Sequence, residues 1–439
     1  MFAKQRLYVT LAAIALAFVV AMRSELVFSL AQVALAVLLV AFGYQIWALW
    51  GAKKGSVVCS RDCPERLSNG DENRIVLLLE NRYPFAVEVE VIDEIPPVFQ
   101  RRDLMFRLRL ARGETRTVDY VLRPTQRGLY SFGCVHVLVS LARWGLLCRR
   151  FRTAGDFTAK VYPSFVHLRR YALAAASNSL TQPGNKKLRR VGQQLEPDQI
   201  KTYVEGDDYR TINWKATARR NALMVNVFND ERAQNLLCVI DKGRTMQAAF
   251  GGMMLLDYAI NAALALAYVA MLKGDKAGAL TFEKDLDSYL APNRNALQLA
   301  HLQELLYAQT TTFAESDYSA PLQLLSEKLP NRALLLIFTN FDSVMAMNRQ
   351  LKYLAMLARR HTVVTVFFED SELEAFARKH PGTKVEIYET AIAQKLLFDK
   401  QLIISKLRRN NIIPLLTRPD QLTVEAINVY LEMKGRGEI

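Results

Sequence analysis

The chain has 439 residues, of which 51% are hydrophobic, and a formal net charge of +14. This length accommodates two or three domains. Five cysteines without regular spacing exclude a disulfide-stapled secreted framework. The excess of Lys and Arg is typical of the cytoplasmic side of an inner-membrane protein. It is also compatible with an anionic partner, such as a lipid headgroup surface, nucleic acid or an acidic protein.

Two apolar runs at the N-terminus predict a pair of transmembrane helices within residues 1–54. The first run is Leu7–Met22 and the second is Leu26–Trp50, with only three residues between them. A membrane-spanning helix needs about 20 apolar residues, so the second run is ample and the first is short but workable. In lipid such runs have to be helical, because their backbone groups find no water. The second run follows at once, which favours a hairpin over a cleaved signal peptide.

Charges at the ends of this hairpin predict its orientation. The flanking basic residues are Lys4 and Arg6 before the first run, and Lys53 and Lys54 after the second. The connecting loop, by contrast, is charge-balanced. The positive-inside rule then places both ends in the cytoplasm, so we expect an inner-membrane protein whose N-terminus and soluble domains are cytoplasmic.

Residues 55–165 alternate between apolar and polar positions with a period of two, as at Ala86–Val91. Several such segments are separated by turns, for example at Arg112–Glu114. This pattern predicts an antiparallel β-sandwich. The segment Arg127–Ser140 is expected to form one strand. His136 lies within it, where a structural role is favoured over a ligand role.

Residues 166–234 form a predicted linker and a signature segment. The linker contains four basic residues, Lys186, Lys187, Arg189 and Arg190. They could contact anionic lipid or nucleic acid, or they could belong to a solvated linker.

From residue 235 to 439 the pattern changes to alternating apolar strands and helices. The run Leu236–Asp241 is a buried-strand pattern, and 252–272 is a long helical stretch. Further strand–helix pairs follow to the C-terminus. This alternation predicts a doubly wound, mainly parallel sheet with helices on both faces. Functional sites of such folds lie at the carboxyl ends of the strands.

Polar residues follow two of these strands and one loop. The first strand ends in Asp241, followed by Lys242, Gly243, Arg244 and Thr245. The predicted strand Ala333–Asn340 ends in Thr339 and Asn340 and is followed by Phe341 and Asp342. Another loop brings Ser316 and Asp317 to the start of a helix. We expect these side chains to converge on one edge of the sheet.

This layout resembles the von Willebrand factor A fold and its metal-ion-dependent adhesion site. In that family carboxylate and hydroxyl oxygens hold a hard cation, usually Mg²⁺. The resemblance places Asp241 at the first carboxylate and Thr245 at the second hydroxyl. It places Ser316 near the threonine position and Asn340 at the later aspartate.

Several positions depart from that site. Gly243 stands at the first serine and Asn340 lacks a charge, while Lys242 and Arg244 add positive charge. We therefore expect weak Mg²⁺ binding or none, and no other cofactor. The edge could instead bind an acidic partner through Arg244 and the helix N-terminus, or it could be purely structural. The candidate residues for partner binding are Lys242, Arg244 and Asp317.

The signature segment runs from Val204 to Phe228. Asp207 or Asp208 can cap a short helix over Tyr209–Arg220, whose basic end suits the helix dipole. Asn221 can take the left-handed conformation that ends it.

The whole segment is similar to the signature of the domain-of-unknown-function 58 (DUF58) family. The residues that carry the resemblance are Glu205, Asp207, Asp208, Arg210, Trp214, Lys215 and Arg219. Members usually have Asp at the position of Asn213. The family is typically linked with MoxR-type AAA+ ATPases. The resemblance implies a membrane-anchored partner of such an ATPase, acting in assembly, maturation or envelope stress.

Two interpretations of the signature segment remain. In the first, Trp214 is a buried anchor that clasps the segment onto the α/β domain, with Arg210 and Arg219 bonding carboxylates. In the second, the segment is an exposed docking surface for the partner.

The sequence lacks the motifs of the common enzyme classes. It contains no G-x-x-x-x-G-K-[ST], no H-E-x-x-H and no G-x-S-x-G. We therefore expect a non-catalytic interaction module rather than an enzyme. The alternatives are a protein that binds anionic lipid or nucleic acid and a structural component of an envelope complex. Salt dependence separates the first alternative from a packed protein interface.

Overall fold

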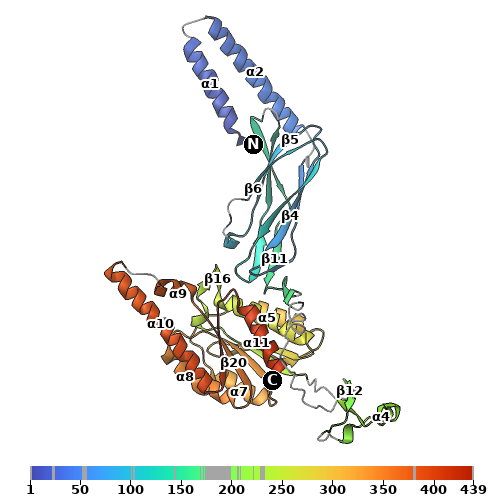
Figure 1. The fold of residues 1–439 in the computed structure, drawn as a ribbon. Coiled ribbons are helices and arrows are strands. Elements are labelled where there is room, and N and C mark those ends of the chain that lie inside the picture. Colours follow the sequence, from blue (N-terminus) through green and yellow to red (C-terminus); the bar gives the residue numbers. More distant parts are fainter. Residues whose placement is uncertain are drawn as a thin grey trace. The chain divides into compact units, whose positions relative to one another are not determined.

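The structure is a computed structural model of the chain (Figure 1). It forms two compact units, Met1–Tyr162 and Pro163–Ile439, which are described separately below. The residues that the structure describes are 2–21, 25–51, 57–99, 101, 104–142, 145–168, 170, 171, 173, 199–204, 207, 209–220, 222–227, 233–378 and 382–437.

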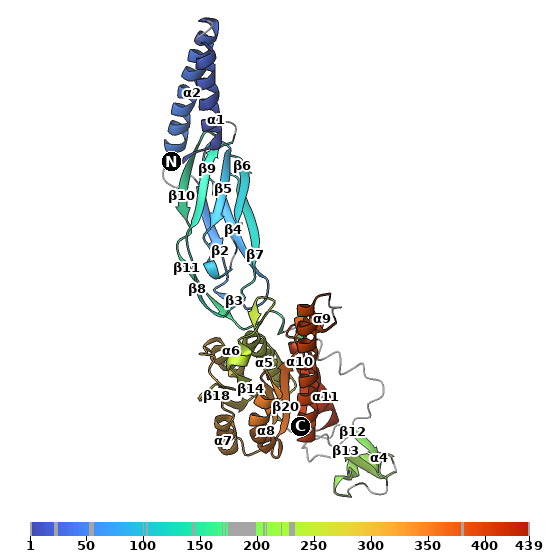
Figure 2. The same cartoon turned by 90° about the vertical axis from the view of Figure 1, so that its left-hand side faces the viewer.

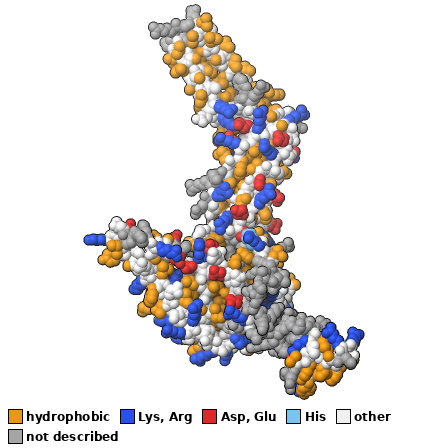
Figure 3. All heavy atoms as spheres, viewed as in Figure 1, with side chains coloured by type: hydrophobic (Ala, Val, Ile, Leu, Met, Phe, Trp, Pro, Cys, Tyr) orange, Lys and Arg blue, Asp and Glu red, His pale blue; other side chains and the backbone are white. Residues whose placement is uncertain are grey.

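Two apolar helices begin the first unit. They are α1 (Gln5–Ala21) and α2 (Glu25–Trp50), and they run side by side, with Phe18 and Phe28 in edge-to-face contact. Figure 3 shows hydrophobic side chains over the visible face of this pair. The segment Leu26–Trp50 is long, apolar and largely exposed, so it could be a membrane span, whereas Gln5–Val20 is shorter. The other helix of sufficient length and hydropathy, Leu255–Leu272, is mostly buried in the second unit.

A β-sandwich follows the helices, as the period-two pattern predicts. One sheet has the strand order β1-β10-β9-β5-β6, and the others are β2-β4-β7 and β3-β11-β8. The strands alternate between core and solvent along their length, as in β4, and their inner faces share one apolar core. The predicted single strand at Arg127–Ser140 is wrong, because Gly133 and Cys134 separate β8 from β9. The strands are β1 (Phe2–Ala3), β2 (Val57–Asp62), β3 (Arg66–Ser68), β4 (Asn73–Asn81), β5 (Val87–Asp93), β6 (Met105–Leu110), β7 (Thr115–Leu122), β8 (Gly128–Phe132), β9 (Val135–Leu141), β10 (Leu147–Thr153) and β11 (Phe157–Tyr162).

The apolar helices are joined to the sandwich by specific contacts. The two residues of β1 extend the sheet by pairing with β10. Near the end of α2, the buried Gln45 Oε1 accepts hydrogen bonds from the backbone N–H groups of Leu146 at 2.9 Å and Leu147 at 3.1 Å. The Tyr83 hydroxyl donates to the carbonyl of Leu49 at 3.1 Å. The helices and the sandwich therefore form one structural unit and are not separate domains joined by a flexible linker.

The signature segment forms a small structure of its own. The strands β12 (Gln199–Thr202) and β13 (Met224–Val227) pair antiparallel. Between them lie a 3-10 turn, η2 (Tyr209–Thr211), and a short helix, α4 (Trp214–Arg220). The predicted continuous helix over Tyr209–Arg220 is therefore wrong in its first part, because the chain makes a 3-10 turn before α4 begins.

The α/β domain contains a six-stranded sheet with the order β18-β17-β14-β19-β20-β21. Counted along the chain within this domain, the order is 3-2-1-4-5-6, the doubly wound arrangement. All neighbours are parallel except the edge strand β18, which pairs antiparallel with β17 and which the sequence patterns did not indicate. The strands are β14 (Asn235–Asp241), β17 (Lys276–Phe282), β18 (Leu286–Asn293), β19 (Leu334–Phe338), β20 (Thr362–Phe368) and β21 (Ile412–Thr417).

Helices cover both faces of this sheet, as predicted (Figure 2). On one face α5, α6 and α11 share a core with Leu236, Cys238 and Ile240 of β14. On the other face α7, α8 and α10 share a core with Leu237 and Val239 of the same strand. Alternate residues of one strand thus serve opposite layers. The helices are α5 (Leu255–Leu272), α6 (Gln298–Tyr307), α7 (Ser319–Lys328), α8 (Val344–Ala358), α9 (Ser371–Arg378), α10 (Lys384–Arg409) and α11 (Leu422–Arg436).

Candidate functional site

The strand order singles out one place at the carboxyl edge of the sheet. The chain goes from β14 to β17 on one side and later returns to β19 on the other side. Ligand sites of doubly wound folds lie at this switch point, outside the carboxyl ends of the two strands. Here β14 ends in Asp241, and β19 is followed directly by Thr339. Both side chains are buried.

Asp241 is held by donors from four residues. Its Oδ1 accepts from the backbone N–H of Gly243 at 2.8 Å and from the Ser316 hydroxyl. Its Oδ2 accepts from Thr339 Oγ1 at 2.7 Å and from the Tyr318 hydroxyl at 3.0 Å. The Tyr318 hydroxyl also lies 2.6 Å from Thr339 Oγ1. We call Asp241, Ser316, Tyr318 and Thr339 the Asp241 cluster.

Burial governs the electrostatics of this cluster. Asp241 is 2% exposed, and burial raises the pKa of its carboxyl, although the four donors act in the opposite direction. Burial and the neighbouring Asp241 carboxyl raise the pKa of Tyr318 well above its usual value. Tyr318 is therefore a neutral hydrogen-bond donor and has no tendency to ionise as a base or nucleophile.

The surroundings of Gly243 leave no room for the serine that stands at this position in the metal-ion-dependent adhesion site. Its backbone is extended, with φ −72° and ψ 179°, so a side chain would fit the backbone conformation. A Cβ at this position, however, would overlap Ser316 Oγ and would lie 3.1 Å from both Asp241 Oδ1 and the Ala314 carbonyl. The Ser316 hydroxyl thus occupies the space that the missing side chain would need.

Two further predicted site residues, the adhesion-site position Asn340 and the partner-binding candidate Asp317, lie at the same edge of the sheet but outside the Asp241 cluster. Asn340 is half-buried, and its Nδ2 lies 3.4 Å from the carbonyl oxygen of Thr245, to which it donates. Asp317 caps the start of α7, accepting from the backbone N–H of Ser319 at 2.8 Å and from its hydroxyl at 2.7 Å. Hydrogen bonding to Ser319 lowers the pKa of Asp317.

The donor set does not fit a divalent cation. Both oxygens of Asp241 already accept hydrogen bonds from N–H and O–H groups, and a cation would have to displace these donors. Within the described part of the chain, no group of three or more His, Cys, Asp and Glu residues is placed to hold a metal. We therefore assign the Asp241 cluster a structural role at the switch point.

Lys242 is not the partner-binding residue that its position in the sequence suggested. It is 2% exposed, and its Nζ donates to Asp287 Oδ2 at 2.9 Å and to the carbonyl of Thr310 at 2.7 Å. The side chain reaches β18 and the loop after α6 and is shielded from solvent. Burial therefore removes Lys242 from the candidates for partner contact.

Exposed side chains surround the buried cluster. Arg244 has a 77% exposed side chain and lies 4.0 Å from Asp342. Arg349 of α8 pairs with Glu315 at 2.7 Å, and Met345 of the same helix is 80% exposed. We call Arg244, Met345 and Arg349 the carboxyl-edge face.

The signature segment differs from the predicted clasp. Trp214 is 70% exposed, and none of the α4 residues is buried. The anchor interpretation is therefore wrong for the structure as described, because α4 is tied to β13 by polar groups instead. Glu205 and Asp208 of the signature, Asn221, and the basic cluster Lys186–Arg190 lie outside the described residues.

Asn213, rather than Asp207, caps the signature helix. Its Oδ1 accepts from the backbone N–H of Ala216 at 3.0 Å, and its Nδ2 donates to Asn226 Oδ1 at 2.8 Å. Asn and Asp are equally good caps, so the departure from the family pattern keeps this role. Asp207 instead closes the preceding turn, accepting from Val204 N at 3.0 Å and from Lys201 Nζ at 2.7 Å.

The sequence patterns missed Tyr318 as a member of the cluster and noted Thr339 without giving it a role. Tyr318 follows the loop residues Ser316 and Asp317 within a helix start, and nothing local marks it as polar and buried. Thr339 could have been found, since it directly follows a fully buried strand and precedes Asn340.

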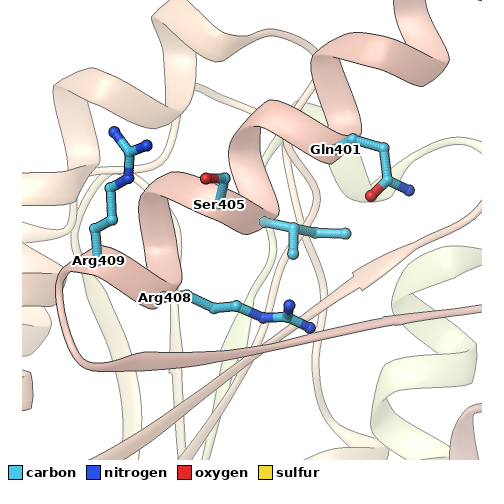
Figure 4. Close-up of a pocket in the computed structure, with 5 residues that line it drawn as sticks. Gln401, Ser405, Arg408 and Arg409 are labelled. Carbon is cyan, nitrogen blue, oxygen red and sulfur yellow. The ribbon is translucent and has the colours of Figure 1, made fainter.

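A surface depression of about 440 Å³ lies beside the last turns of α10. Figure 4 shows Arg408 and Arg409 pointing in different directions from the helix, with Gln401 and Ser405 also on its surface. Because these polar groups do not converge on one point, we assign the depression no ligand.

Comparisons with known proteins confirm the family resemblance that the signature segment indicated. Residues 199–378 match the family model described as "Protein of unknown function DUF58". The uncharacterized protein YeaD of Bacillus subtilis is 25% identical over 183 residues, which are 40% of this chain. The match spans 45% of that relative, so the chain covers less than half of its length.

Solved structures resemble parts of the chain only distantly. The CARDB domain of a Pyrococcus furiosus protein is 13% identical with a TM-score of 0.18, covering 24% of this chain and 86% of that domain. A PapD-like domain of human CEP192 is 15% identical with a TM-score of 0.20, covering 26% and 92%. Proximal thread matrix protein 1 from the mussel byssus is 10% identical with a TM-score of 0.26, covering 46% and 48%. The family assignment rests on the sequence match alone: residues 199–378 of this chain belong to the DUF58 family.

Proposed function

We propose that the protein is a membrane-anchored, non-catalytic interaction module and that its partner is a MoxR-type AAA+ ATPase. The processes implied by the family resemblance are assembly, maturation or envelope stress. The proposal has three parts, which concern the anchor, the fold of the α/β domain and the binding face.

The anchor is a two-helix transmembrane hairpin of the inner membrane. An exposed apolar helix of the length of α2 needs a nonpolar environment, and α1 is its antiparallel companion. Both ends of the pair contact the sandwich, which fits a hairpin whose ends lie on the same side of the bilayer. By the positive-inside rule that side is the cytoplasm. A reporter fused to the C-terminus should therefore be active in the cytoplasm, and activity only on the far side would contradict this topology.

The α/β domain is von Willebrand factor A-like. Two features support this assignment. The strand order is 3-2-1-4-5-6 with an antiparallel third strand, β18, and the first strand, β14, ends in Asp241. In this domain the metal-binding position has become a closed hydrogen-bonded cluster.

The observation that carries the non-catalytic function is the saturation of Asp241. A hydrolase or transferase at the switch point needs a group that is free to accept a proton or attack a substrate. Here both carboxylate oxygens are occupied by donors from Gly243, Ser316, Tyr318 and Thr339, and the cluster is buried. The cluster instead fixes the three loops that surround it.

The binding face that we favour on the α/β domain is the carboxyl-edge face. Arginine and methionine are enriched at protein interfaces, and Arg244, Met345 and Arg349 are all exposed there. Arg244 directly follows Gly243, and Arg349 of α8 pairs with Glu315, the neighbour of Ser316. Gly243 and Ser316 are both bonded to Asp241, so the Asp241 cluster fixes the loops beside this face and pre-organises it for binding.

Co-purification of the full-length protein from mild detergent tests the proposal, with and without ATP and Mg²⁺. We expect the AAA+ ATPase to be recovered with the wild-type protein and to be lost with Arg244→Glu/Met345→Ala. A matched control is Arg378→Glu, which reverses an exposed arginine on α9. Absence of the ATPase under every condition, or turnover of a substrate by the purified protein alone, would refute the proposal.

A further inference from the structure

The short helix α4 presents a compact mixture of aromatic and basic side chains to solvent. Trp214, Lys215, Ala218 and Arg219 stand at positions i, i+1, i+4 and i+5, so they share one side of the helix. All four are exposed, and Trp214 is 70% exposed. Figure 3 shows hydrophobic and basic side chains together on the visible part of the signature segment.

These four residues are not needed to hold the segment together. Asn213 caps α4 and bonds to Asn226, and Thr217 Oγ1 accepts from the backbone N–H of Met224 at 3.0 Å. Asp207 and Lys201 close the turn between β12 and η2. Other polar residues of the signature therefore hold the local structure. Trp214, Lys215, Ala218 and Arg219, which we call the α4 face, remain for another role.

The segment buries very little apolar surface by itself. Among its described residues, Met224 and Val225 are the buried hydrophobic side chains. An isolated two-stranded hairpin is only marginally stable in water unless another element covers it. Large apolar side chains of the segment are nevertheless exposed, namely Ile200, Val204, Tyr209, Trp214 and Leu223.

We propose that the α4 face docks on a second protein, in an apolar pocket that takes Trp214 and is rimmed by carboxylates that bind Lys215 and Arg219. Tryptophan and arginine are the residues most often found at the energetic centre of protein interfaces. Basic side chains next to the tryptophan require an acidic rim, because charges across an interface are complementary. This inference rests on the proposed interaction function and adds the surface and the chemistry of its partner.

A polypeptide fits this face better than a lipid surface or nucleic acid. A helix that lies in a lipid interface needs a broad apolar face, whereas the apolar residues on this side of α4 are Trp214 and Ala218. The sequence of the segment also contains the acidic residues Glu205, Asp207 and Asp208, so the segment is not the uniformly basic stripe that is typical of phosphate binding. A protein surface can match both signs of charge.

Photo-cross-linking in cells tests the proposal on the full-length chain. The variant Trp214→p-benzoylphenylalanine places the reactive group at the centre of the face. The matched control is Tyr388→p-benzoylphenylalanine, which places it on α10 at a tyrosine that is 72% exposed. The same cross-linker at position 214 is then combined with Lys215→Glu/Arg219→Glu. Because all of these side chains are exposed, the variants should fold normally, and an unchanged Tm checks this point.

We expect position 214 to form an adduct with another polypeptide at a peptide rich in Asp and Glu, and the control position to give no such adduct. Charge reversal at Lys215 and Arg219 should reduce the yield by at least about tenfold, as expected for hot-spot contacts. An adduct within this chain or with a second copy, an adduct with lipid or nucleic acid, or no adduct above the control would overturn the inference. Co-purification of the ATPase is scored separately, so the proposed function and this inference can fail independently.

Discussion

Substitution of Gly243 by alanine tests how the switch point is built. The backbone of Gly243 is extended, so alanine brings no conformational strain, but its methyl group would overlap Ser316 Oγ. Overpacking of this kind costs about 2 kcal/mol. For a folded unit of this size that corresponds to a fall in Tm of roughly 4–8 °C.

The decisive comparison is the double variant. Ser316→Ala alone removes a hydrogen bond to a buried carboxylate, which costs about 1.5 kcal/mol. Independent effects would then sum to about 3.5 kcal/mol in Gly243→Ala/Ser316→Ala. Because the alanine methyl at 243 fills the space left by the hydroxyl, we expect the double variant to lose only about 1.5–2 kcal/mol. The predicted coupling is therefore favourable by about 1.5–2 kcal/mol.

Thermal and urea unfolding of the full-length protein in detergent measures the four proteins of this cycle. Gly435→Ala in α11 is the matched control, since a Cβ there meets nothing within 4 Å. It should stabilise by about 0.5–1 kcal/mol through helix propensity. If Gly243→Ala leaves the Tm within about 1 °C of the wild type, or if the two effects simply add, the account of the Asp241 cluster is wrong.

Three further substitutions test other parts of the structure. Burial raises the pKa of Asp241, so its folded form loses stability as the pH rises from about 4 through the folded pKa. Asp241→Asn should flatten this decline in a series of Tm measurements, and an unchanged slope would show that Asp241 does not titrate in this way. Lys242→Met should cost about 1–2 kcal/mol by removing the bonds to Asp287 and the Thr310 carbonyl, yet leave partner recovery intact. Loss of the partner with normal stability would restore Lys242 as a contact residue. Gln45→Ala should lower the Tm of the first unit through about 2 kcal/mol of lost hydrogen bonds to two backbone N–H groups, and circular dichroism of the protein in detergent measures this. A Tm equal to that of the wild type would contradict a fixed junction between α2 and the sandwich.

Local sequence patterns sufficed for most of the architecture. The apolar runs, the period-two segments and the later strand–helix alternation each depend on neighbouring residues, and all three correspond to elements in the structure. The signature was specific enough to identify the DUF58 region. The edge strand β18 escaped notice because its exposed positions interrupt the buried pattern of its neighbours.

Local patterns failed at two places, the start of the signature helix and the environment of Lys242. Asn213 replaced Asp207 as the cap because the chain first makes a 3-10 turn, which shifts the start of α4 to Trp214. Lys242 looked like an exposed charge beside Asp241, but its side chain is buried and bonds to Asp287 of β18 and to the Thr310 carbonyl. No local pattern distinguishes a buried lysine from an exposed one.

The sequence by itself determined the apolar helix pair, the sandwich, the doubly wound domain and the family of residues 199–378, because hydrophobic period and signature motifs are read over short distances. Only the tertiary structure decided what Asp241 does. Its hydroxyl donors come from 75, 77 and 98 residues further along the chain. A carboxylate can bind a cation or accept hydrogen bonds from hydroxyl groups, depending on which loops fold against it. The packing of the whole sheet determines which loops these are.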